Sequence, residues 1–438
     1  MKKIIYKLVK HEAFINLKDS RIRNTLTATD LKTLKENKFK KLIEHAIKYS
    51  PYYKEVLETI NINTIDDLSK IPILTKTILS NKSGDIKSTR VEDLKSLKKN
   101  STSGSTGAAT HFFSDVRDKR EARAVRGDEF VPNFKFLDRQ LIFWGAERDV
   151  ISKKSLSYFF NKYIVGKKIV STYHLTSKDI DSYIEQINNF RPSTIVGYPS
   201  ALHFMALEVQ KRNLLLKHRP NGIISAGETL QLHQKEVIEK VFKTKIYNRY
   251  GCREVGHIAN ECNKHDGLHY SADDLVIEVI DNDGQICKEG VIGNLLITDL
   301  NNYAFPMIRY NIGDLGAIAT YSDCGCGSTL PKLKTVAGRS FDIIHGLNGN
   351  KVSGTFWTLT FRNRVKGVEA FQIKQFLNYK IIINVKTNEH FNQQEADNIK
   401  QLVCDKLGAK IEVEIIEVQD FEYTHTGKFK WITSQLNN

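Results

Sequence analysis

The stretch Ser193-Thr194-Ile195-Val196-Gly197-Tyr198-Pro199-Ser200 decides the fold class. Its apolar first half predicts a short buried strand, and we expect a helix to follow from Ala201 to about Leu214. A second strand is predicted at Gly222–Gly227 and a second helix at Glu228–Phe242. Short apolar strands that alternate with helices of about a dozen residues are typical of a parallel sheet covered on both faces.

Further strands are predicted on either side, at Gln140–Trp144 and Lys245–Tyr250. Ligands of such sheets lie beyond the carboxyl ends of the strands. Three segments are therefore expected along one rim of the sheet: Gly197–Ser200, Ala226-Gly227-Glu228 and Tyr250-Gly251.

Beyond these strands the pattern changes. Leu275–Ile280 and Gly293–Thr298 predict a hairpin, which we expect Arg309–Asp314 to close with a turn. Near the other end, Phe39–Tyr49 has helical periodicity and should stop at Ser50-Pro51.

A smaller unit begins after Gly338-Arg339, with strands predicted at Phe371–Lys374, Lys380–Val385 and Lys410–Ile416 and a helix at Gln393–Leu407. The expected fold is α/β: a large domain over residues 1–338, with parallel sheets covered by helices plus an antiparallel subdomain, and a small α+β domain over residues 339–438.

Composition sets limits on the partners. The chain has 438 residues, 41% hydrophobic, with a formal net charge of +15, which favours anionic ligands. Its lysines are dispersed and no nucleic-acid-binding signature accompanies them, so no nucleic-acid partner is expected. No apolar run could span a bilayer, and we expect a cytoplasmic protein. For the basic segment 1–10 we favour a helix lying on the core over membrane docking.

A loop rich in glycine and hydroxyl residues runs from Ser101 to Gly107. Such a loop can bring backbone N–H groups and hydroxyls close to the oxygens of a polyphosphate. It is not a Walker loop, because no lysine follows Gly107. Taken alone, it would also suit a flexible linker.

Five motifs in order give the chain its resemblance to a known family. It resembles the adenylate-forming superfamily of acyl-CoA synthetases and adenylation domains, and within it the phenylacetate–CoA ligase family with its CapK-like members. The motifs are Ser101–Gly107, Tyr250-Gly251-Cys252-Arg253-Glu254, Arg309-Tyr310-Asn311-Ile312-Gly313-Asp314, Gly338-Arg339 with Asp342, and Thr426-Gly427-Lys428.

The resemblance implies an ATP- and Mg²⁺-dependent ligase that works in two half-reactions. A carboxylic acid attacks the α-phosphorus of ATP to give an acyl-adenylate, and a nucleophile then displaces AMP. Coenzyme A would be the acceptor in a phenylacetate–CoA ligase, and an amine such as an amino sugar would fit a CapK-like role in capsular polysaccharide biosynthesis. A carboxylate needs no general base, so positioning and charge neutralisation should carry the first step.

The resemblance also implies a role for individual residues. Lys428 would reach the reacting carboxylate and α-phosphate, Glu254 would help to bind Mg²⁺, Asp314 would accept hydrogen bonds from the ribose, and Arg339 would lie beside it. The remaining nucleotide-binding residues would be Ser103, Gly104, Ser105, Thr106 and Gly107 for the β- and γ-phosphates, and Ala226, Gly227, Glu228, Tyr250 and Gly251 around the adenine and α-phosphate.

Two positions depart from the family pattern. Phe341 stands where an acidic hinge residue is common, which puts the usual rotation of the small domain in doubt. Asn311-Ile312 replaces the common Arg or Lys followed by Thr, without removing Asp314.

A cluster of cysteines suggests a second site. Cys324 and Cys326 form a compact pair, and Cys262 and His269 precede them. Three Cys and one His suit tetrahedral structural zinc, and similar proteins of the family carry the same pattern. His257, His265 and Cys252 are the other nearby candidates.

Two other functions stay open at this point. The chain could be an adenylyltransferase that passes AMP itself to a hydroxyl acceptor. It could also be a basic protein without enzymatic activity that binds nucleic acid or a membrane, with the Ser/Gly loop as a linker.

Overall fold

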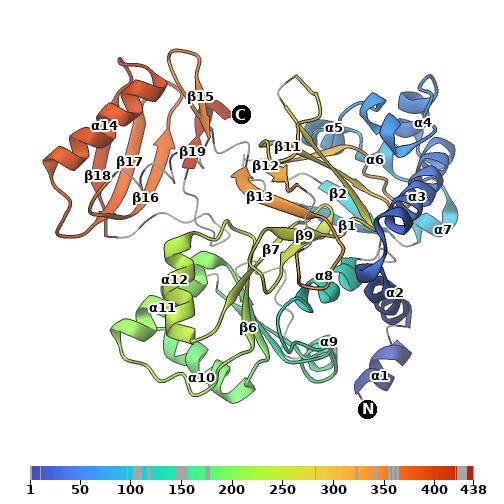
Figure 1. The fold of residues 1–438 in the computed structure, drawn as a ribbon, viewed down its shortest axis with the longest axis horizontal. Helices are drawn as coiled ribbons and strands as arrows, with labels where there is room; N and C mark the ends of the chain where they lie inside the picture. Colours follow the sequence, from blue (N-terminus) through green and yellow to red (C-terminus); the bar gives the residue numbers. More distant parts are fainter. Residues whose placement is uncertain are drawn as a thin grey trace. The chain divides into compact units, whose positions relative to one another are not determined.

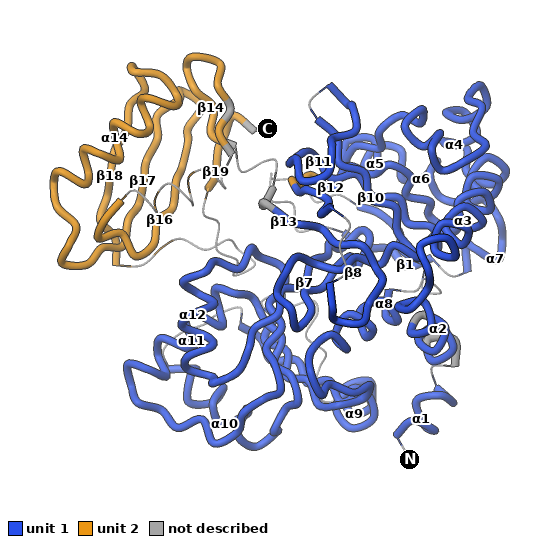
Figure 2. Tube along the Cα trace, viewed as in Figure 1, with its two compact units in different colours: residues 1–312, 316–336 blue, residues 313–315, 337–438 orange. Residues whose placement is uncertain are grey.

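The structure is a computed structural model of the chain. It describes residues 2–9, 11–95, 97–101, 111–115, 120–144, 156–172, 178–281, 283–320, 324–339, 343–353, 357, 361, 365–419, 421 and 432–437. The chain divides into two compact units (Figure 2). Unit 1 comprises residues 1–312 and 316–336, and unit 2 comprises residues 313–315 and 337–438.

Unit 1 is built on one sheet of eleven strands, in the order β10-β11-β12-β13-β9-β8-β7-β6-β5-β3-β4 (Figure 1). In that order the strands are β10 (Leu275–Ile280), β11 (Gly293–Asp299), β12 (Tyr310–Ile318), β13 (Lys332–Arg339), β9 (Leu268–Tyr270), β8 (Gly256–Glu261), β7 (Ile246–Cys252), β6 (Gly222–Ala226), β5 (Thr194–Gly197), β3 (Gln140–Trp144) and β4 (Lys167–Ser171).

The sheet has a parallel and an antiparallel half. From β4 to β7 every neighbouring pair is parallel. The pairs β7–β8, β8–β9, β9–β13 and β10–β11 are antiparallel. Arg309–Asp314 is not the turn that we expected, because β12 begins at Tyr310 and runs through Asp314 to Ile318.

Three helices cover one face of the parallel half: α10 (Ile180–Phe190), α11 (Pro199–Lys211) and α12 (Leu232–Phe242). Their apolar side chains form a core with β3, β5, β6 and β7. Proline at the first position of α11 suits a helix start, because its missing N–H has no partner there anyway. α12 begins four residues later than predicted, since Gln231 and Gln234 form a capping box just before it.

The opposite face of the parallel half is also covered. α8 (Arg120–Asp128) packs against β8, the antiparallel neighbour of β7, and leads the chain to the parallel strands. Val131, which follows that helix, joins Val196, Ile224 and Tyr247 in a small apolar cluster. The sheet is therefore enclosed on both faces, as the continuous apolar strands predicted.

Most of the helical elements between Ala28 and Leu94 pack on the antiparallel half and share its core. Thr27 caps the longest of them through the backbone N–H of Asp30, and Ser50 caps the next, which begins at Pro51. These elements are α3 (Ala28–Tyr49), α4 (Pro51–Leu57), η2 (Ile65–Lys70), α5 (Lys76–Asn81), α6 (Ser83–Ile86) and α7 (Val91–Leu94).

Smaller elements complete unit 1. They are α1 (Lys2–Val9), α2 (His11–Ile22), η1 (Arg23–Thr25), the hairpin β1 (Leu97–Ser101) and β2 (His111–Asp115), α9 (Leu156–Phe159) and the π-helix η4 (Phe160–Val165). None of the helices among the described residues is both long and apolar enough to cross a membrane.

Unit 2 has its own sheet and core. Its four-stranded sheet has the order β18-β17-β16-β19, and α14 packs on it. The elements are β14 (Ile343–His345), β15 (Lys351–Ser353), β16 (Val368–Gln375), β17 (Ile381–Thr387), α14 (Gln393–Leu407), β18 (Val413–Glu417), β19 (Ile432–Ser434) and η5 (Gln435–Asn437). The two units together confirm the fold class inferred from the sequence.

Candidate active site and Cys/His centre

The rim of the parallel half brings two of the predicted ligand-binding segments together. Ala226 is the last residue of β6, and Gly227 turns the chain with φ of +81°. The Glu228 carboxylate then accepts a hydrogen bond from the backbone N–H of Ser200, at 3.1 Å from its Oε2. Because Ser200 lies in the first turn of α11, this carboxylate stabilises the helix where unpaired N–H groups and the helix dipole favour negative charge.

A tight turn joins β7 to β8 at the neighbouring position on the rim. Ala226 pairs with Arg249 across β6 and β7, and the β7–β8 register shifts between Tyr250 and Gly251. A Cβ atom at Gly251 would lie 2.6 Å from the carbonyl oxygen of Gly256. No other residue would fit there without a backbone shift, so the turn requires glycine at this position.

Glu254, the predicted Mg²⁺ ligand, lies within this turn and is buried. Its Oε1 accepts a hydrogen bond of 2.9 Å from the hydroxyl of Tyr310. The contact joins two of the five sequence motifs, which are 56 residues apart in the chain. The sequence analysis gave Tyr310 no role; its place within a motif was the available signal.

The other predicted site residues are described in part or not at all. Asp314 is half-buried within β12 and follows Gly313, whose φ is +78°. Arg339 is the last residue of β13. Ser103, Gly104, Ser105, Thr106 and Gly107 lie outside the described residues, and so do Phe341, Asp342 and Lys428.

Buried ion pairs behind the antiparallel half were not predicted. Arg126 makes two hydrogen bonds to the Asp273 carboxylate, of 2.8 and 2.7 Å, and Arg123 contacts Asp299 at 3.2 Å. All four side chains are almost fully buried. Both arginines come from α8, at a spacing of three residues that places them on one side of a helix.

Asp274 is buried beside this group and has a lysine partner. Lys38 Nζ lies 2.6 Å from Asp274 Oδ1. Burial alone would raise the pKa of Asp274, but Lys38, Arg123 and Arg126 together hold it well below its ordinary value. The carboxylate is therefore charged at neutral pH and ties α3 to the segment that precedes β10.

A further polar cluster lies where α8 ends. Arg249 of β7 forms an ion pair with Asp128, which also accepts a 2.9 Å hydrogen bond from the Gln140 side chain. His257 of β8 is fully buried next to Asn260 and hydrogen-bonds to it. Burial, with a contribution from the positive charge of Arg249, lowers the pKa of His257 to about 3. This histidine is thus neutral at physiological pH.

Two aromatic side chains meet at the carboxyl ends of β3 and β5. The rings of Trp144 and Tyr198 have centroids 4.5 Å apart at an angle of 34°. Tyr198 is buried. Aromatic packing accounts for this contact.

The Cys/His centre is the part of the prediction that the structure assembles most completely. Cys262, His269, Cys324 and Cys326 each offer a ligand atom, and these atoms lie within 4.8 Å of one another. Cys262 Sγ is 3.5 Å from Cys324 Sγ, and Cys326 Sγ is 3.4 Å from His269 Nε2. With Zn–S of about 2.3 Å and Zn–N of about 2.0 Å, tetrahedral ligands are about 3.5–3.8 Å apart. The donor set fits zinc.

The surroundings of His269 favour the ligating tautomer. Its Nδ1 lies 2.7 Å from the Leu330 carbonyl oxygen, which requires a proton on Nδ1 and leaves the Nε2 lone pair facing the cysteines. Burial raises the pKa of Cys262 to about 12, and Cys324 and Cys326 add to the effect. A divalent cation would offset this by stabilising the thiolates.

The centre joins strands that are distant in sequence. Cys262 directly follows β8, His269 lies in β9, and both cysteines of the later pair precede β13. Of the alternative ligands, His265 contacts Glu261 at 2.9 Å, whereas His257 belongs to the polar cluster described above. The Cys252 sulfur accepts from the backbone N–H of Val255 at 3.4 Å in the β7–β8 turn.

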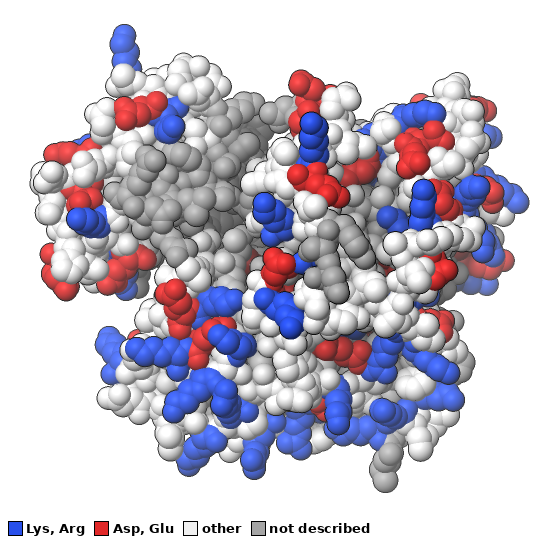
Figure 3. All heavy atoms as spheres, viewed as in Figure 1, with Lys and Arg blue, Asp and Glu red and all other residues white. Residues whose placement is uncertain are grey.

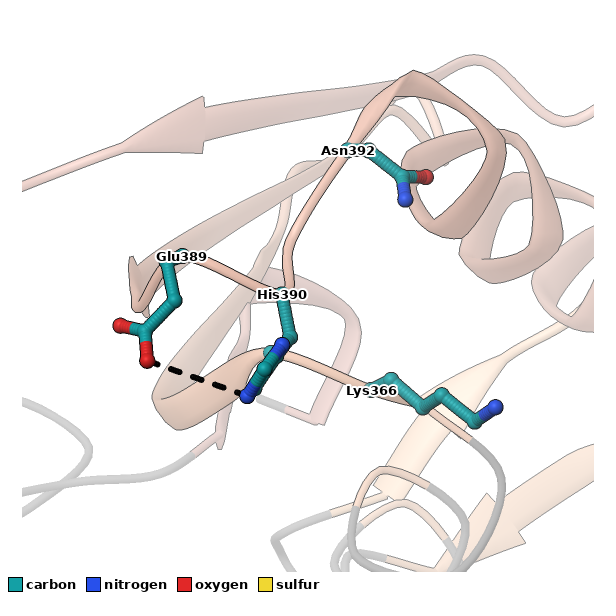
Figure 4. A pocket seen from close by; sticks show the side chains of 5 residues that line it. Lys366, Glu389, His390 and Asn392 are labelled. Atoms are coloured by element: carbon teal, nitrogen blue, oxygen red, sulfur yellow. Dashed lines mark ion pairs between the residues drawn. The ribbon is translucent and has the colours of Figure 1, made fainter.

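A pocket in unit 2 does not coincide with either site. It is lined by Lys366, Gly367, Glu389, His390 and Asn392, next to the start of α14 (Figure 4). Glu389 and His390 are 3.8 Å apart and both are largely exposed. None of these five lining residues was predicted to act in the reaction. The pocket gives no reason to include them among the candidate site residues.

Comparisons with known proteins place the molecule in a class first. Over 94% of this chain and 91% of the other, the structure matches a crystal structure of 2-hydroxyisobutyryl-CoA ligase in the postadenylation state, in complex with R3-HIB-AMP, with a TM-score of 0.74 and 18% identity. The fold is that of the adenylate-forming ligases.

Comparisons of sequence identify relatives within this class. Residues 344–435 match the family model described as the CapK C-terminal domain. The protein CapK of Staphylococcus aureus is 25% identical over 74% of this chain and 71% of its own length. Phenylacetate-coenzyme A ligase of Thermus thermophilus is 26% identical over 74% of both chains. The predicted relationship to CapK and the phenylacetate–CoA ligases, and with it the class of an adenylate-forming ligase, is confirmed.

Proposed function

We propose that the protein activates a carboxylic acid with ATP and Mg²⁺ as an acyl-adenylate and then transfers the acyl group to a nucleophile. Unit 1 would bind ATP and the acid. Unit 2, which contains Lys428, would act as the mobile domain that completes the site. Coenzyme A is the first candidate for the acceptor, and an amine such as an amino sugar is the second.

One observation carries the proposal. Glu228 just after β6 and Gly251 near the end of β7 lie on the same rim, and the buried Glu254 lies in the turn that follows β7. This rim is where parallel sheets bind ligands. The segment Tyr250–Glu254, which contains the β7–β8 turn, is one of the motifs that the chain shares with an adenylate-forming family.

The described residues would contribute binding and orientation. The missing side chain of Gly251 lets β7 approach the Gly256 carbonyl closely, and this approach shapes the turn that carries Glu254. Tyr310 holds one oxygen of the Glu254 carboxylate, a hard donor of the kind that Mg²⁺ takes beside phosphate oxygens. Mg²⁺, when bound, would neutralise charge on the phosphates. The substrate carboxylate is itself the nucleophile, so no side chain has to remove a proton.

The choice of acceptor rests on indirect support. The net charge of +15 suits coenzyme A, which carries several phosphate charges. The CapK likeness keeps an amine in view, because that protein and this chain are similar over 343 residues. A role in capsular polysaccharide biosynthesis would follow only for the amine.

Exchange of labelled pyrophosphate into ATP tests the first half-reaction. The purified protein should catalyse exchange with at least one acid from a panel of aromatic, aliphatic and hydroxy acids, at saturating ATP and Mg²⁺. Adding coenzyme A or amino sugars to the active acid then identifies the acceptor. If no acid supports exchange in a protein that binds ATP, acid activation is wrong.

The products of the same reaction distinguish an acid ligase from an adenylyltransferase. Such an enzyme would leave AMP covalently attached to its product, whereas an acid ligase releases free AMP when the acceptor is added. Mass spectrometry of the product distinguishes the two.

We also propose that Cys262, His269, Cys324 and Cys326 hold a structural zinc ion. All four positions would be protein ligands, as is usual where zinc stabilises a fold and does not take part in a reaction. The ion would fix the loop before β13 onto the β8–β9 hairpin, which follows directly from the Glu254 turn. The geometry of the four ligand atoms supports the proposal.

Metal analysis of the purified protein tests it without reference to activity. We expect about one zinc per chain. The Cys324→Ser/Cys326→Ser variant should lose the metal and melt at a lower temperature, whereas Cys404→Ser, a matched control in unit 2, should keep both. A wild-type protein without zinc that melts at the same temperature with and without a chelator would contradict the proposal.

A further inference from the structure

The N-terminal helix α1 has more apolar surface than the core covers. Tyr6 is buried: its ring packs edge-on against Phe136 at 5.0 Å, and its hydroxyl donates to Glu121 at 3.0 Å. Ile4 and Leu8 lie one helical turn apart on the side opposite Tyr6. They are 65% and 78% exposed.

The neighbouring element is apolar and exposed as well. α1 packs on the π-helix η4, and both contribute to one small core. Next to this contact, the Phe159 and Tyr163 rings stack at 6.2 Å with an angle of 11° while remaining about half exposed. We call the exposed apolar residues on α1, α9 and η4 the N-terminal patch: Ile4, Leu8, Val9, Leu156, Phe159 and Tyr163.

The elements that carry the patch have charges of a single sign. Residues 2–9 and 156–172 contain no Asp or Glu, and their charged side chains are all lysines: Lys2, Lys3, Lys7, Lys162, Lys167 and Lys168. Lys162 lies over the Tyr163 ring, with Nζ 4.8 Å from its centroid. In Figure 3 the part of unit 1 that holds α1, α9 and α10 in Figure 1 is mostly blue and white, with little red.

α1 lies on the core through Tyr6, as expected from the sequence. We propose that its opposite side, with the rest of the N-terminal patch, docks unit 1 onto an anionic membrane surface. Apolar side chains flanked by lysines, on a helix lying along the surface, are the combination that inserts shallowly between anionic headgroups. A second copy of the chain would fit less well, because two such patches would bring like charges together. Lysines are also depleted at protein–protein interfaces. Docking would not depend on the acid-activating function proposed above.

Binding to lipid vesicles tests the proposal on the full-length protein. We expect it to float with vesicles that contain phosphatidylglycerol and not with vesicles of phosphatidylcholine alone, and to be released by high salt. Ile4→Asn/Leu8→Asn should weaken binding by about tenfold or more, because each side chain loses its transfer into the acyl region. Lys3→Glu/Lys7→Glu should weaken it by a similar factor.

Two further variants separate docking from damage to α1. Phe159→Asn/Tyr163→Asn changes the patch on a different element and should also weaken vesicle binding. Leu215→Asn/Leu377→Asn removes two side chains that are equally exposed, both 68%, but lie outside the patch, and should bind as wild type does. Far-ultraviolet circular dichroism should show the same helix content in all variants.

Three outcomes would overturn the proposal. The first is no binding to phosphatidylglycerol vesicles by the wild-type protein. The second is equal loss of binding in the Leu215/Leu377 control. The third is a dimer in analytical ultracentrifugation that the Ile4/Leu8 variant abolishes, because the patch would then belong to a second copy.

Discussion

Both halves of the eleven-stranded sheet pack on an apolar core, but they differ in the polar contacts that are added to that core. The parallel half, β4 to β7, packs against α10, α11 and α12 through a core of aliphatic and aromatic side chains. Behind the antiparallel half, individual polar side chains make specific contacts: Arg126 with Asp273, Arg123 with Asp299, and the four side chains of the Cys/His centre.

This difference suggests that the two halves have different roles. Non-directional apolar packing fixes the layers of the parallel half and leaves its rim free for ligands. Directional contacts in the antiparallel half fix the strands that follow the Glu254 turn. Changes behind the antiparallel half should therefore alter stability, and changes among the reacting groups should alter rate. The following predictions test that separation, from the largest expected effect to the smallest.

Loss of one partner of a buried ion pair should have the largest effect. Asp273→Leu leaves the buried Arg126 guanidinium without its two hydrogen bonds, and should lower the free energy of unfolding by about 3–5 kcal/mol. Chemical denaturation measures this. In the double variant Arg126→Met/Asp273→Leu no cation is left unpaired, and part of the stability should return. A double variant at least as unstable as the single one would show that the ion pair is not what fixes this half.

Lys428→Ala should act on rate alone. Loss of a single donor to the transition state slows a reaction by about a hundredfold or more, and we expect adenylation to slow by roughly two to three orders of magnitude. Pyrophosphate exchange gives the rate, and thermal melting should show an unchanged fold. A rate within about twofold of wild type would remove Lys428 from the mechanism.

Acidification should destabilise unit 1 through His257. Its pKa is about 3 in the folded protein against 6.5 for the ordinary side chain. Between these values the unfolded chain binds a proton that the folded one does not. Stability should therefore fall as pH drops below 6.5, by about 1.4 kcal/mol per pH unit.

His257→Asn should remove that part of the slope, measured by denaturation between pH 7 and pH 5. Burial also lowers the pKa of His45 and His269. Some slope should therefore remain in the variant, and the difference between the two proteins is the quantity to measure. Identical slopes would mean that His257 is charged in the folded state.

A small truncation in the parallel half should have the smallest effect. Ile223 is fully buried in β6, and Ile223→Val removes one methylene group, which lowers the free energy of unfolding by about 0.5–1.5 kcal/mol. The loss should be the same at low and high salt, because no charge is involved. A marked salt dependence would contradict the view that Ile223 stabilises this layer through apolar packing.

Local patterns made much of the fold readable from the sequence. The strand Gln140–Trp144 and the helix Gln393–Leu407 lie where their periodicity placed them. Arg309–Asp314 was wrongly expected to be a turn, because its glycine and charged residues look like turn chemistry. Arg309 is instead buried with its guanidinium on Glu278 at 3.1 Å, a partner that no local pattern reveals.

The candidate site also contains residues that local sequence predicts and contacts that it does not predict. Cys262, His269, Cys324 and Cys326 could be grouped in advance because few other residues have the chemistry to bind zinc. The contact of Tyr310 with Glu254 and the pairing of Arg123 with Asp299 could not, because 56 and 176 residues separate the partners and only the folded sheet brings them together. The roles of Ser103–Gly107 and Lys428 stay predictions.

The continuity of the large sheet limits how the protein can be shortened. β7 pairs with β6 on one side and with β8 on the other, so a cut between the two halves would leave long strand edges bare. Bare edges recruit other chains and promote aggregation. Unit 1 is therefore expected to fold only when both halves of its sheet are present. The segment 343–437 has a sheet and core of its own and is the fragment to produce separately.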